Sequence, residues 1–367
     1  MRKMTDIDEI GRKLLNTHKY SRDEIEIIIP KLREIDRLRN EKDAVIMAHY
    51  YQIPPIQLIA DRVGDSLALA LAGHDSYLNG RLIISSTVYF MAEMIKILNP
   101  KSKVVIPDTK ASCSIAEGMN ASTVMRIRES YPDSSIVAYI NTTAEVKSVV
   151  DVVCTSANAD TIIKNMDGNP IILIPDYFFA KNIVKRITDD RKGRRYLAYK
   201  MIRDGNIVLE DLDSCREETI PLDKTDMPLL PEGTCIVHKR FTPIDIYEYK
   251  RLGVVDTIIA HPEVSPAVAE EVDMVGGTNK MISHLRDHPE FKRILFITEC
   301  DMAAPLREAF PEREFFTPCR LCDYMRKNNL DNLVNSLINE EYEVTVDPDI
   351  AYGARRSLER MLELTGF

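Results

Sequence analysis

The feature that most constrains this sequence is a repeated alternation of short Val/Ile-rich runs with longer segments of helical periodicity. Strands that alternate with helices in this way are typical of parallel sheets, because each helix crosses from one strand to the next. We predict a strand at each of nine runs: 45–48, 82–84, 104–106, 136–138, 152–154, 171–174, 257–260, 272–275 and 294–297. The pattern therefore predicts an α/β protein with mostly parallel sheets.

The nine runs group into three sets of three, which indicates a weak threefold internal repeat. In each set, the first run ends at His or Tyr, the second at a turn rich in hydroxyl groups or glycine, and the third at Pro-Asp or Thr-Glu. The predicted repeats span 36–114 (with parts of the N- and C-terminal helices), 115–235 with a polar insertion at about 187–231, and 236–345. Because ligands gather at the carboxyl ends of parallel strands, three sheets facing inward would surround one cavity.

The composition is that of a globular chain, with 45% hydrophobic and 29% charged residues. No apolar run approaches the roughly 18 residues that a membrane span needs. Residues 1–15 also lack the apolar core of a signal peptide, so we expect a cytoplasmic protein. The net charge of −9 gives no general attraction for nucleic acid or anionic membranes, and neither is an expected partner.

The seven cysteines, an odd number, fit a disulfide framework poorly. One candidate ligand follows the third run of each set: Cys113, Cys235 and Cys322. Three thiolates on an iron–sulfur cluster would leave one iron without a protein ligand and open to substrate. Three alternatives stay open. Cys235 and His238 have a Cys-x-x-His spacing that can bind zinc, Cys319 and Cys322 could form a redox pair, and buried cysteines often only fill a core.

Histidines and hydroxyl-rich turns follow many of the same runs. His49, His238 and His261 stand beside other polar groups after strand ends, where an imidazole can move protons or bind an anion. Four turns would present N–H groups and a hydroxyl to a carboxylate or phosphate, with ordinary N-capping as the alternative. These turns are Gly64-Asp65-Ser66, Ser85-Ser86-Thr87, Thr155-Ser156 and Gly277-Thr278. The sequence has no Walker A loop or Gly-x-Gly-x-x-Gly motif, so classical nucleotide binding is not predicted.

Several short motifs stand in order between about residue 40 and residue 340. They are His49-Tyr50-Tyr51-Gln52, Gly64-Asp65-Ser66-Leu67, Phe90-Met91-Ala92-Glu93, Tyr139-Ile140-Asn141-Thr142-Thr143, Cys154-Thr155-Ser156-Ala157-Asn158, Cys235-Ile236-Val237-His238, His261-Pro262-Glu263, Gly276-Gly277-Thr278 and Cys322-Asp323-Tyr324-Met325. Together they resemble the quinolinate synthase family, the iron–sulfur enzymes of NAD biosynthesis. The resemblance implies three similar three-layer αβα sandwich domains with pseudo-threefold symmetry around a central active site, in agreement with the repeat.

The resemblance also implies a reaction and a cofactor. Members of the family condense iminoaspartate with dihydroxyacetone phosphate and eliminate phosphate and water to give quinolinate. L-aspartate oxidase or aspartate dehydrogenase would supply the imine. The implied cofactor is a 4Fe–4S cluster held by Cys113, Cys235 and Cys322, with one iron open as a Lewis acid.

Motif positions imply roles for individual residues. Tyr51 and Glu263 would transfer protons, and His238 would act beside the cluster. Cationic groups and N–H-rich turns would stabilise the phosphate and the diacid. The implied substrate-binding residues are His49, Ser66, Tyr139, Asn141, Ser156, His261, Gly277 and Thr278.

Three positions depart from the family pattern. The family usually has Ser-Thr at Gly277-Thr278, Cys at Val264, and Gly-Val-Asp at Thr87-Val88-Tyr89. We expect Val264 to be neutral packing, whereas the other two fall at the substrate pocket. They leave open a paralogous iron–sulfur lyase or condensing enzyme for another small dicarboxylate. The Cys319–Cys322 spacing leaves open a non-catalytic metal-binding or redox-sensing protein.

Overall fold

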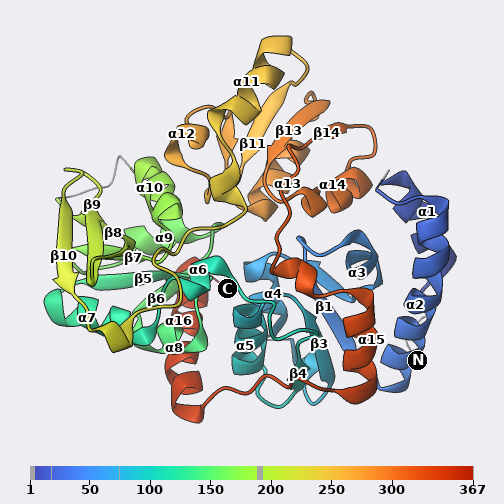
Figure 1. Cartoon of the computed structure of the whole chain (residues 1–367), viewed down its shortest axis with the longest axis horizontal. Helices are drawn as coiled ribbons and strands as arrows, with labels where there is room; N and C mark the ends of the chain where they lie inside the picture. Colours follow the sequence, from blue (N-terminus) through green and yellow to red (C-terminus); the bar gives the residue numbers. More distant parts are fainter. Residues whose placement is uncertain (1–4, 18, 74, 188–192, 367) are drawn as a thin grey trace. The chain divides into compact units, whose positions relative to one another are not determined.

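A computed structural model describes residues 5–17, 19–73, 75–187 and 193–366, and its strands form three sheets (Figure 1). The chain divides into two compact units. The first unit contains 1–112, 299–312 and 321–346, and the second contains 113–298, 313–320 and 347–367. The first sheet belongs to the first unit and the other two belong to the second unit. None of the described helices is long and apolar enough to cross a membrane.

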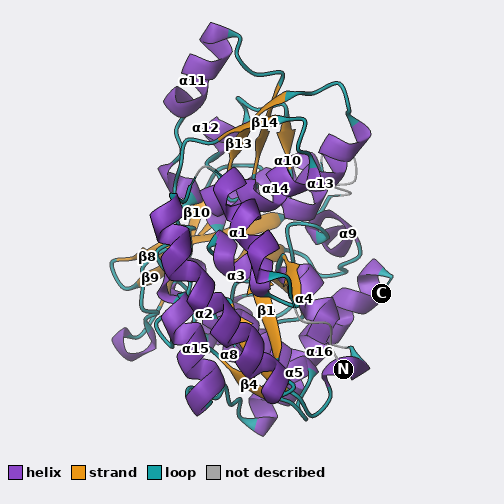
Figure 2. Cartoon of the chain, turned by 90° about the vertical axis from the view of Figure 1, so that its right-hand side faces the viewer, coloured by secondary structure: helices purple, strands orange, loops and turns teal. Residues whose placement is uncertain are grey.

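The first sheet is entirely parallel, with the order β2-β1-β3-β4. Its strands are β1 (Val45–His49), β2 (Arg62–Gly64), β3 (Leu82–Ser86) and β4 (Lys103–Val105). All five residues of β1 are buried, as expected of a parallel strand covered on both faces. Leu32, Ile46 and Leu333 are fully buried in one core that joins this sheet to helices α2 and α15. Figure 2 shows these two helices in front of β1.

The helices of the first unit start where the sequence supplies caps. Ser21 and Glu24 form a capping box at the start of α2, and Asn329 caps α15. The helices are α1 (Ile7–Asn16), α2 (Arg22–Glu41), α3 (Pro54–Ile59), α4 (Ser66–Gly73), α5 (Tyr89–Leu98), α14 (Ala303–Ala309) and α15 (Leu330–Asn339). Short 3₁₀ helices are η1 (Ser76–Leu78), η5 (Cys300–Met302) and η6 (Met325–Lys327).

The second sheet has the order β10-β9-β8-β7-β5-β6, in which β9 and β10 are antiparallel additions to a parallel core. Its strands are β5 (Ser135–Tyr139), β6 (Val152–Cys154), β7 (Ile171–Ile174), β8 (Tyr196–Arg203), β9 (Asn206–Asp211) and β10 (Glu217–Pro221). Its helices are α6 (Ser114–Glu117), α7 (Ala121–Ser130), α8 (Ala144–Val149), α9 (Ala159–Lys164), α10 (Tyr177–Arg186) and α16 (Pro348–Thr365). The C-terminal helix α16 packs against α8 and β6 (Figure 1).

The third sheet is parallel, with the order β12-β11-β13-β14. Its strands are β11 (Thr257–Ala260), β12 (Met274–Val275), β13 (Arg293–Ile297) and β14 (Glu314–Phe316). Between its strands or before them come α11 (Pro243–Leu252), α12 (Pro266–Ala269) and α13 (Thr278–Asp287). Two further 3₁₀ turns of the second unit are η3 (Lys224–Asp226) and η4 (His238–Arg240).

The prediction of an α/β fold with parallel-dominated sheets is confirmed, and each predicted run overlaps a strand, although run 104–106 extends one residue beyond β4 and run 272–275 begins two residues before β12. The sequence pattern missed β2, β8, β9, β10 and β14. β2 is only Arg62-Val63-Gly64, with an exposed arginine, so it has no apolar run that could reveal it. The antiparallel strand β10 is the last strand of its sheet, and only Ile220 of its five residues is buried, so it has no apolar run.

When β2 is counted, a different set of turns corresponds among the three sheets than the sequence pattern predicted. When each sheet is written from the same end, the orders β2-β1-β3-β4, β6-β5-β7-β8 and β12-β11-β13-β14 correspond. The turn that matches Thr155-Ser156 and Gly277-Thr278 is therefore Gly64-Asp65-Ser66, and not Ser85-Ser86-Thr87 as the grouping of runs predicted. The symmetric placement of three domains about one centre stays a prediction.

Candidate active site

In each sheet, the register places the end of one strand beside the turn that follows its neighbour. The last register pairs are His49 with Gly64, Tyr139 with Cys154, and Ala260 with Val275. A hydroxyl residue follows the second member of each pair, at Ser66, Ser156 and Thr278. Equivalent first-strand ends carry His49, Tyr139 and His261, and the residues two positions later are Tyr51, Asn141 and Glu263. In each sheet, the parallel register thus brings the predicted site residues together at the carboxyl ends of the strands.

In the first unit, His49 and Tyr51 lie against each other at the end of β1. Their ring centroids are 4.6 Å apart in an edge-on arrangement, and the backbone N–H of Tyr51 donates to His49 Nδ1 at 3.1 Å. Ser66 begins α4, two residues beyond the Gly64 that pairs with His49. These three predicted residues therefore share one end of the first sheet.

In the second unit, Glu263 is the centre of a buried polar cluster. Tyr139 Oη donates to Glu263 Oε1 at 2.6 Å, and His238 Nδ1 lies 2.7 Å from Glu263 Oε2. His261 Nδ1 lies 3.7 Å from the same oxygen, and its ring stacks on that of His238 at 4.6 Å. Phe179 stacks on Tyr139 at 4.0 Å and fixes the orientation of the phenol. Four predicted site residues are thus brought together, although 124 residues separate Tyr139 from Glu263.

The cluster controls the ionisation of its two carboxyl groups. Burial alone would favour protonated Glu263, but the charges of His261 and His238 and the hydrogen bonds from His238 and Tyr139 outweigh it and hold its pKa well below the usual range. Asp176, which follows β7, is also buried, and burial together with the nearby Glu263 charge raises its pKa well above the usual value. Two carboxyl groups whose environments push their pKa values apart are typical of acid–base sites.

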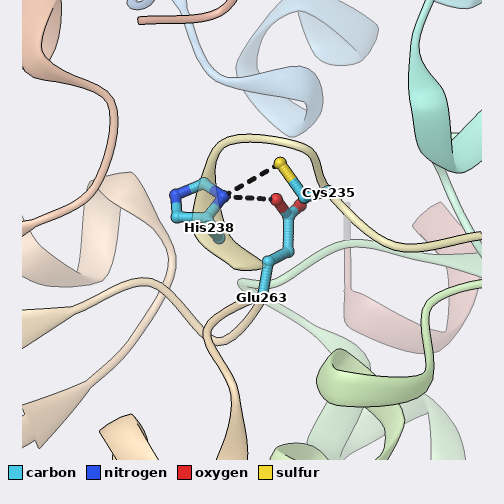
Figure 3. A group of neighbouring side chains, drawn as sticks. All are labelled: Cys235, His238 and Glu263. Atoms are coloured by element: carbon cyan, nitrogen blue, oxygen red, sulfur yellow. Dashed lines mark hydrogen bonds and ion pairs between the residues drawn. The ribbon is translucent and has the colours of Figure 1, made fainter. Parts of the chain in front are cut away.

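Cys235 lies beside this cluster and completes a set of metal-ligand atoms (Figure 3). Its Sγ is 3.2 Å from His238 Nδ1, and the nearest ligand atoms of Cys235, His238 and Glu263 all lie within 4.8 Å of one another. His238 is held from its other side, where Nε2 lies 2.9 Å from Thr298 Oγ1. Cys235 lies in the loop before the 3₁₀ helix η4, which begins at His238, and both side chains point toward Glu263 (Figure 3).

The loops that carry Cys113 and Cys235 are joined by one side chain that the sequence did not reveal. The Ser114 hydroxyl donates to the carbonyl of Thr234 at 2.8 Å and accepts from the N–H of Ile236 at 3.1 Å. It therefore contacts both neighbours of Cys235. The backbones approach closely just beyond, because a Cβ on Gly118 would lie 2.4 Å from the Cα of Gly233.

Cys322 lies in the first unit, where a buried network supports its loop. Its N–H donates to Glu299 Oε1 at 3.4 Å, and the Gln52 amide donates to the carbonyl of Met325 at 3.1 Å. Arg326 forms an ion pair with the buried Asp301 at 3.0 Å. Burial raises the pKa of the Cys322 thiol to about 11, which leaves it a poor nucleophile unless a metal replaces the proton.

Cys113, Cys235 and Cys322 are all half-buried, and the other cysteines differ from them. Cys319 is disulfide-bonded while Cys322 is not, so the alternative of a Cys319–Cys322 redox pair is not formed. Cys154 is fully buried at the end of β6, as its Val-Val run predicted.

Two predicted site residues have surroundings that the sequence alone could not show. Asn141 Oδ1 is buried and has no hydrogen-bond partner among the described residues, which is the state expected of a group that awaits a ligand. A Cβ on Gly277 would lie 2.3 Å from Ser156 Oγ. The Ser156 hydroxyl therefore occupies the space that a side chain at 277 would need.

The fold and this site define a class of protein. A carboxylate buried among two histidines and a tyrosine at the carboxyl ends of parallel strands is typical of enzymes that use acid–base chemistry, and the adjacent cysteine completes a set of groups that could hold a metal ion. Residues 33–363 match the family model described as quinolinate synthetase A protein. The chain is 35% identical over 336 residues to "Quinolinate synthase" of Sinorhizobium fredii, covering 91% of this chain and 82% of that protein.

Two further relatives agree. "Quinolinate synthase" of Caulobacter vibrioides is 35% identical over 341 residues, covering 91% of this chain and 82% of that protein. "Quinolinate synthase 1" of Mesorhizobium japonicum is 35% identical over 337 residues, covering 92% of each chain. This chain belongs to the quinolinate synthetase A family of enzymes, and the family resemblance drawn from the motifs is confirmed.

Proposed function

We propose that this enzyme condenses iminoaspartate with dihydroxyacetone phosphate and eliminates phosphate and water to form quinolinate for NAD biosynthesis. The observation that carries the proposal is the enclosed Glu263 carboxylate, which Tyr139, His238 and His261 surround in a family member. Both substrates are small anions, in keeping with a site of imidazoles, hydroxyls and N–H groups. L-aspartate oxidase or aspartate dehydrogenase is the expected source of the imine.

In the proposed reaction, some side chains transfer protons and others bind the substrates. Glu263 stays ionised and can accept a proton, while Tyr139 and His238 can relay one to or from it. Tyr51, whose ring packs edge-on against that of His49 in the first unit, can do the same. The turns at Ser66, Ser156 and Thr278, together with Asn141 and Gly277, bind the carboxylates and the phosphate through hydroxyl, amide and N–H donors. Proton transfer by positioned side chains of this kind raises a reaction rate by about 10²–10⁴-fold.

We assign a 4Fe–4S cluster to Cys113, Cys235 and Cys322. These residues fit such a cluster, since each is a half-buried cysteine on a loop, and Ser114 connects the Cys113 loop to the Cys235 loop. When bound, a cluster with one iron open to substrate supplies a Lewis acid that holds a carboxylate or hydroxyl oxygen. His238, which contacts Cys235, stands next to it.

The test uses protein purified without air. We expect about four irons and four sulfides per chain, and quinolinate formation when iminoaspartate and dihydroxyacetone phosphate are supplied together. Cys113→Ser, Cys235→Ser and Cys322→Ser should each lose iron and activity. Cys215→Ser is the matched control, because Cys215 is exposed and should not affect either. Iron loss in the control, or its retention in the other three, would contradict the ligand assignment.

The contact between Gly277 and Ser156 favours one second candidate. It places the Ser156 hydroxyl where the family usually has a serine side chain, so the pocket could accept another small dicarboxylate. In that case wild-type protein with a full cluster would form no quinolinate, and Gly277→Ser would not restore it. Quinolinate formation by the wild type would remove this candidate.

A further inference from the structure

Cys235, His238 and Glu263, which have separate roles in the proposed reaction, together also form a set of possible metal ligands. We infer that, when no cluster is present, these three side chains bind one zinc ion. Their ligand atoms already lie within 4.8 Å of one another in the second unit (Figure 3). One thiolate, one imidazole and one carboxylate are donor types that zinc takes in proteins, and three protein ligands with an open fourth position are common.

Two outer hydrogen bonds prepare the ligand atoms. His238 Nε2 lies 2.9 Å from Thr298 Oγ1, and an N–H donated there makes Nδ1 the nitrogen that faces Cys235 and Glu263. Tyr139 Oη donates to Glu263 Oε1, which leaves Oε2 as the oxygen nearest His238. Ligands of protein zinc sites are commonly oriented by such second contacts.

The geometry requires only small movements. Tetrahedral zinc with ordinary bond lengths separates nitrogen from oxygen by about 3.4 Å and nitrogen from sulfur by about 3.6 Å. His238 Nδ1 lies 2.7 Å from Glu263 Oε2 and 3.2 Å from Cys235 Sγ, so the atoms would move apart by about 0.4–0.7 Å. Zinc would replace the proton that these atoms share. The thiolate and the carboxylate would neutralise its charge, as a buried ion requires.

Zinc binding has a consequence that rests on the proposed function. Cys235 cannot serve zinc and the cluster at the same time, and zinc also takes Glu263, the proposed proton-transfer group. Zinc therefore competes with cluster insertion, and the zinc form is inactive.

The experiment separates the ligands of the two metals. Zn²⁺ is titrated against a chromophoric chelator with cluster-free wild type and with Cys113→Ser and Cys322→Ser, and Co²⁺ serves as a spectroscopic probe of tetrahedral thiolate ligation. We expect one zinc per chain and equal affinity in all three proteins, because both substituted cysteines lie outside the zinc set. Cys235→Ser, His238→Gln and Glu263→Gln should weaken binding by at least about tenfold, and Thr298→Val by about 10–100-fold.

The outcomes decide the inference. Loss of zinc binding in Cys113→Ser or Cys322→Ser would overturn it, because zinc would then use the cluster cysteines. Unchanged affinity in His238→Gln and Glu263→Gln would overturn it as well. If circular dichroism shows that His238→Gln does not fold, the zinc affinities of Glu263→Gln and Thr298→Val test the inference instead. A wild type without cluster or quinolinate formation would contradict the proposed function and leave the zinc result standing, since the titration uses cluster-free protein.

Discussion

Two polar regions of the second unit contain paired carboxylates, but their surroundings differ. The charge ladder of Lys181, Lys200, Arg203, Glu210 and Glu217 extends over α10 and the strands β8, β9 and β10. The site cluster of Tyr139, His238, His261 and Glu263 lies at the ends of β5 and β11 and in the 3₁₀ turn η4. In the ladder, lysine and arginine keep a permanent charge and reach solvent. In the site cluster, the partners of the carboxylate are buried groups whose protons can move.

The difference lies in desolvation. Glu217 and Lys200 pair at 2.8 Å with side chains 30% and 28% exposed, so water screens their attraction. Glu263 is 5% exposed and His238 is fully buried, so their interaction at 2.7 Å is screened far less. Surface pairs of the first kind contribute little to stability, whereas enclosed pairs control proton positions. Glu210 of the charge ladder is buried as well, but its partners Lys181 and Lys200 are 30% and 28% exposed. The two regions therefore differ in the exposure of the partner groups, and not in pairing itself.

The largest expected effect is at the carboxylate of the site cluster. Glu263→Gln keeps the acceptor for Tyr139 but removes the charge and the basic oxygen, so kcat should fall by about 10²–10⁴-fold. Iron content should stay that of the wild type, because Glu263 is not a cluster ligand in our assignment. Steady-state kinetics and iron analysis of the same anaerobic samples check both. A loss of activity below tenfold would remove the distinction drawn between the two regions.

An intermediate effect is expected where backbones, and not flexible side chains, set the geometry. In Gly118→Ala the new methyl would meet Gly233 Cα at 2.4 Å and push α6 away from the Cys235 loop. Overpacking of this kind costs about 1–3 kcal/mol, and we expect a lower melting temperature together with lower iron content. Gly73→Ala is the control, since its Cβ would meet Leu98 at 3.4 Å, an ordinary contact. Equal iron content in Gly118→Ala and the control would show that iron binding does not need the close approach of the two loops.

The smallest effect is expected in the charge ladder. Hydrogen bonds from Arg203 and Lys200 lower the pKa of Glu217 from 4.5 to about 2. A carboxyl whose folded pKa is depressed stabilises the fold above its unfolded pKa and loses that contribution as pH falls toward the folded value. Glu217→Gln should therefore leave activity unchanged and lower the urea midpoint slightly at pH 7. The difference from wild type should shrink as pH falls from 4.5 toward 2, and a difference that grows on acidification would contradict this.

The sequence indicated which polar residues lie together at strand ends better than it indicated the pattern of the repeat. Polar residues after apolar runs identified His49, Tyr139, His261 and Glu263, because the end of a buried strand has a strong local signature. The equivalence of Gly64-Asp65-Ser66 with the other turns was missed, because β2 is too short and too polar to show one. Ser114 gave no signal, since single hydroxyls are common in loops. Asp176 and Thr298 stand at the Pro-Asp and Thr-Glu ends of predicted runs, but the sequence indicated neither a partner nor a role for them.

The order of residues by itself determined the parallel α/β class, the strand ends and the residue types available there. Hydrophobic periodicity reports local burial, and that is enough for these features. Only the tertiary structure decided which groups meet: Tyr139 with Glu263, Thr298 with His238, and Ser114 with the neighbours of Cys235. Those contacts join residues 60 to 124 positions apart. They depend on strand register and helix packing, which no local pattern encodes.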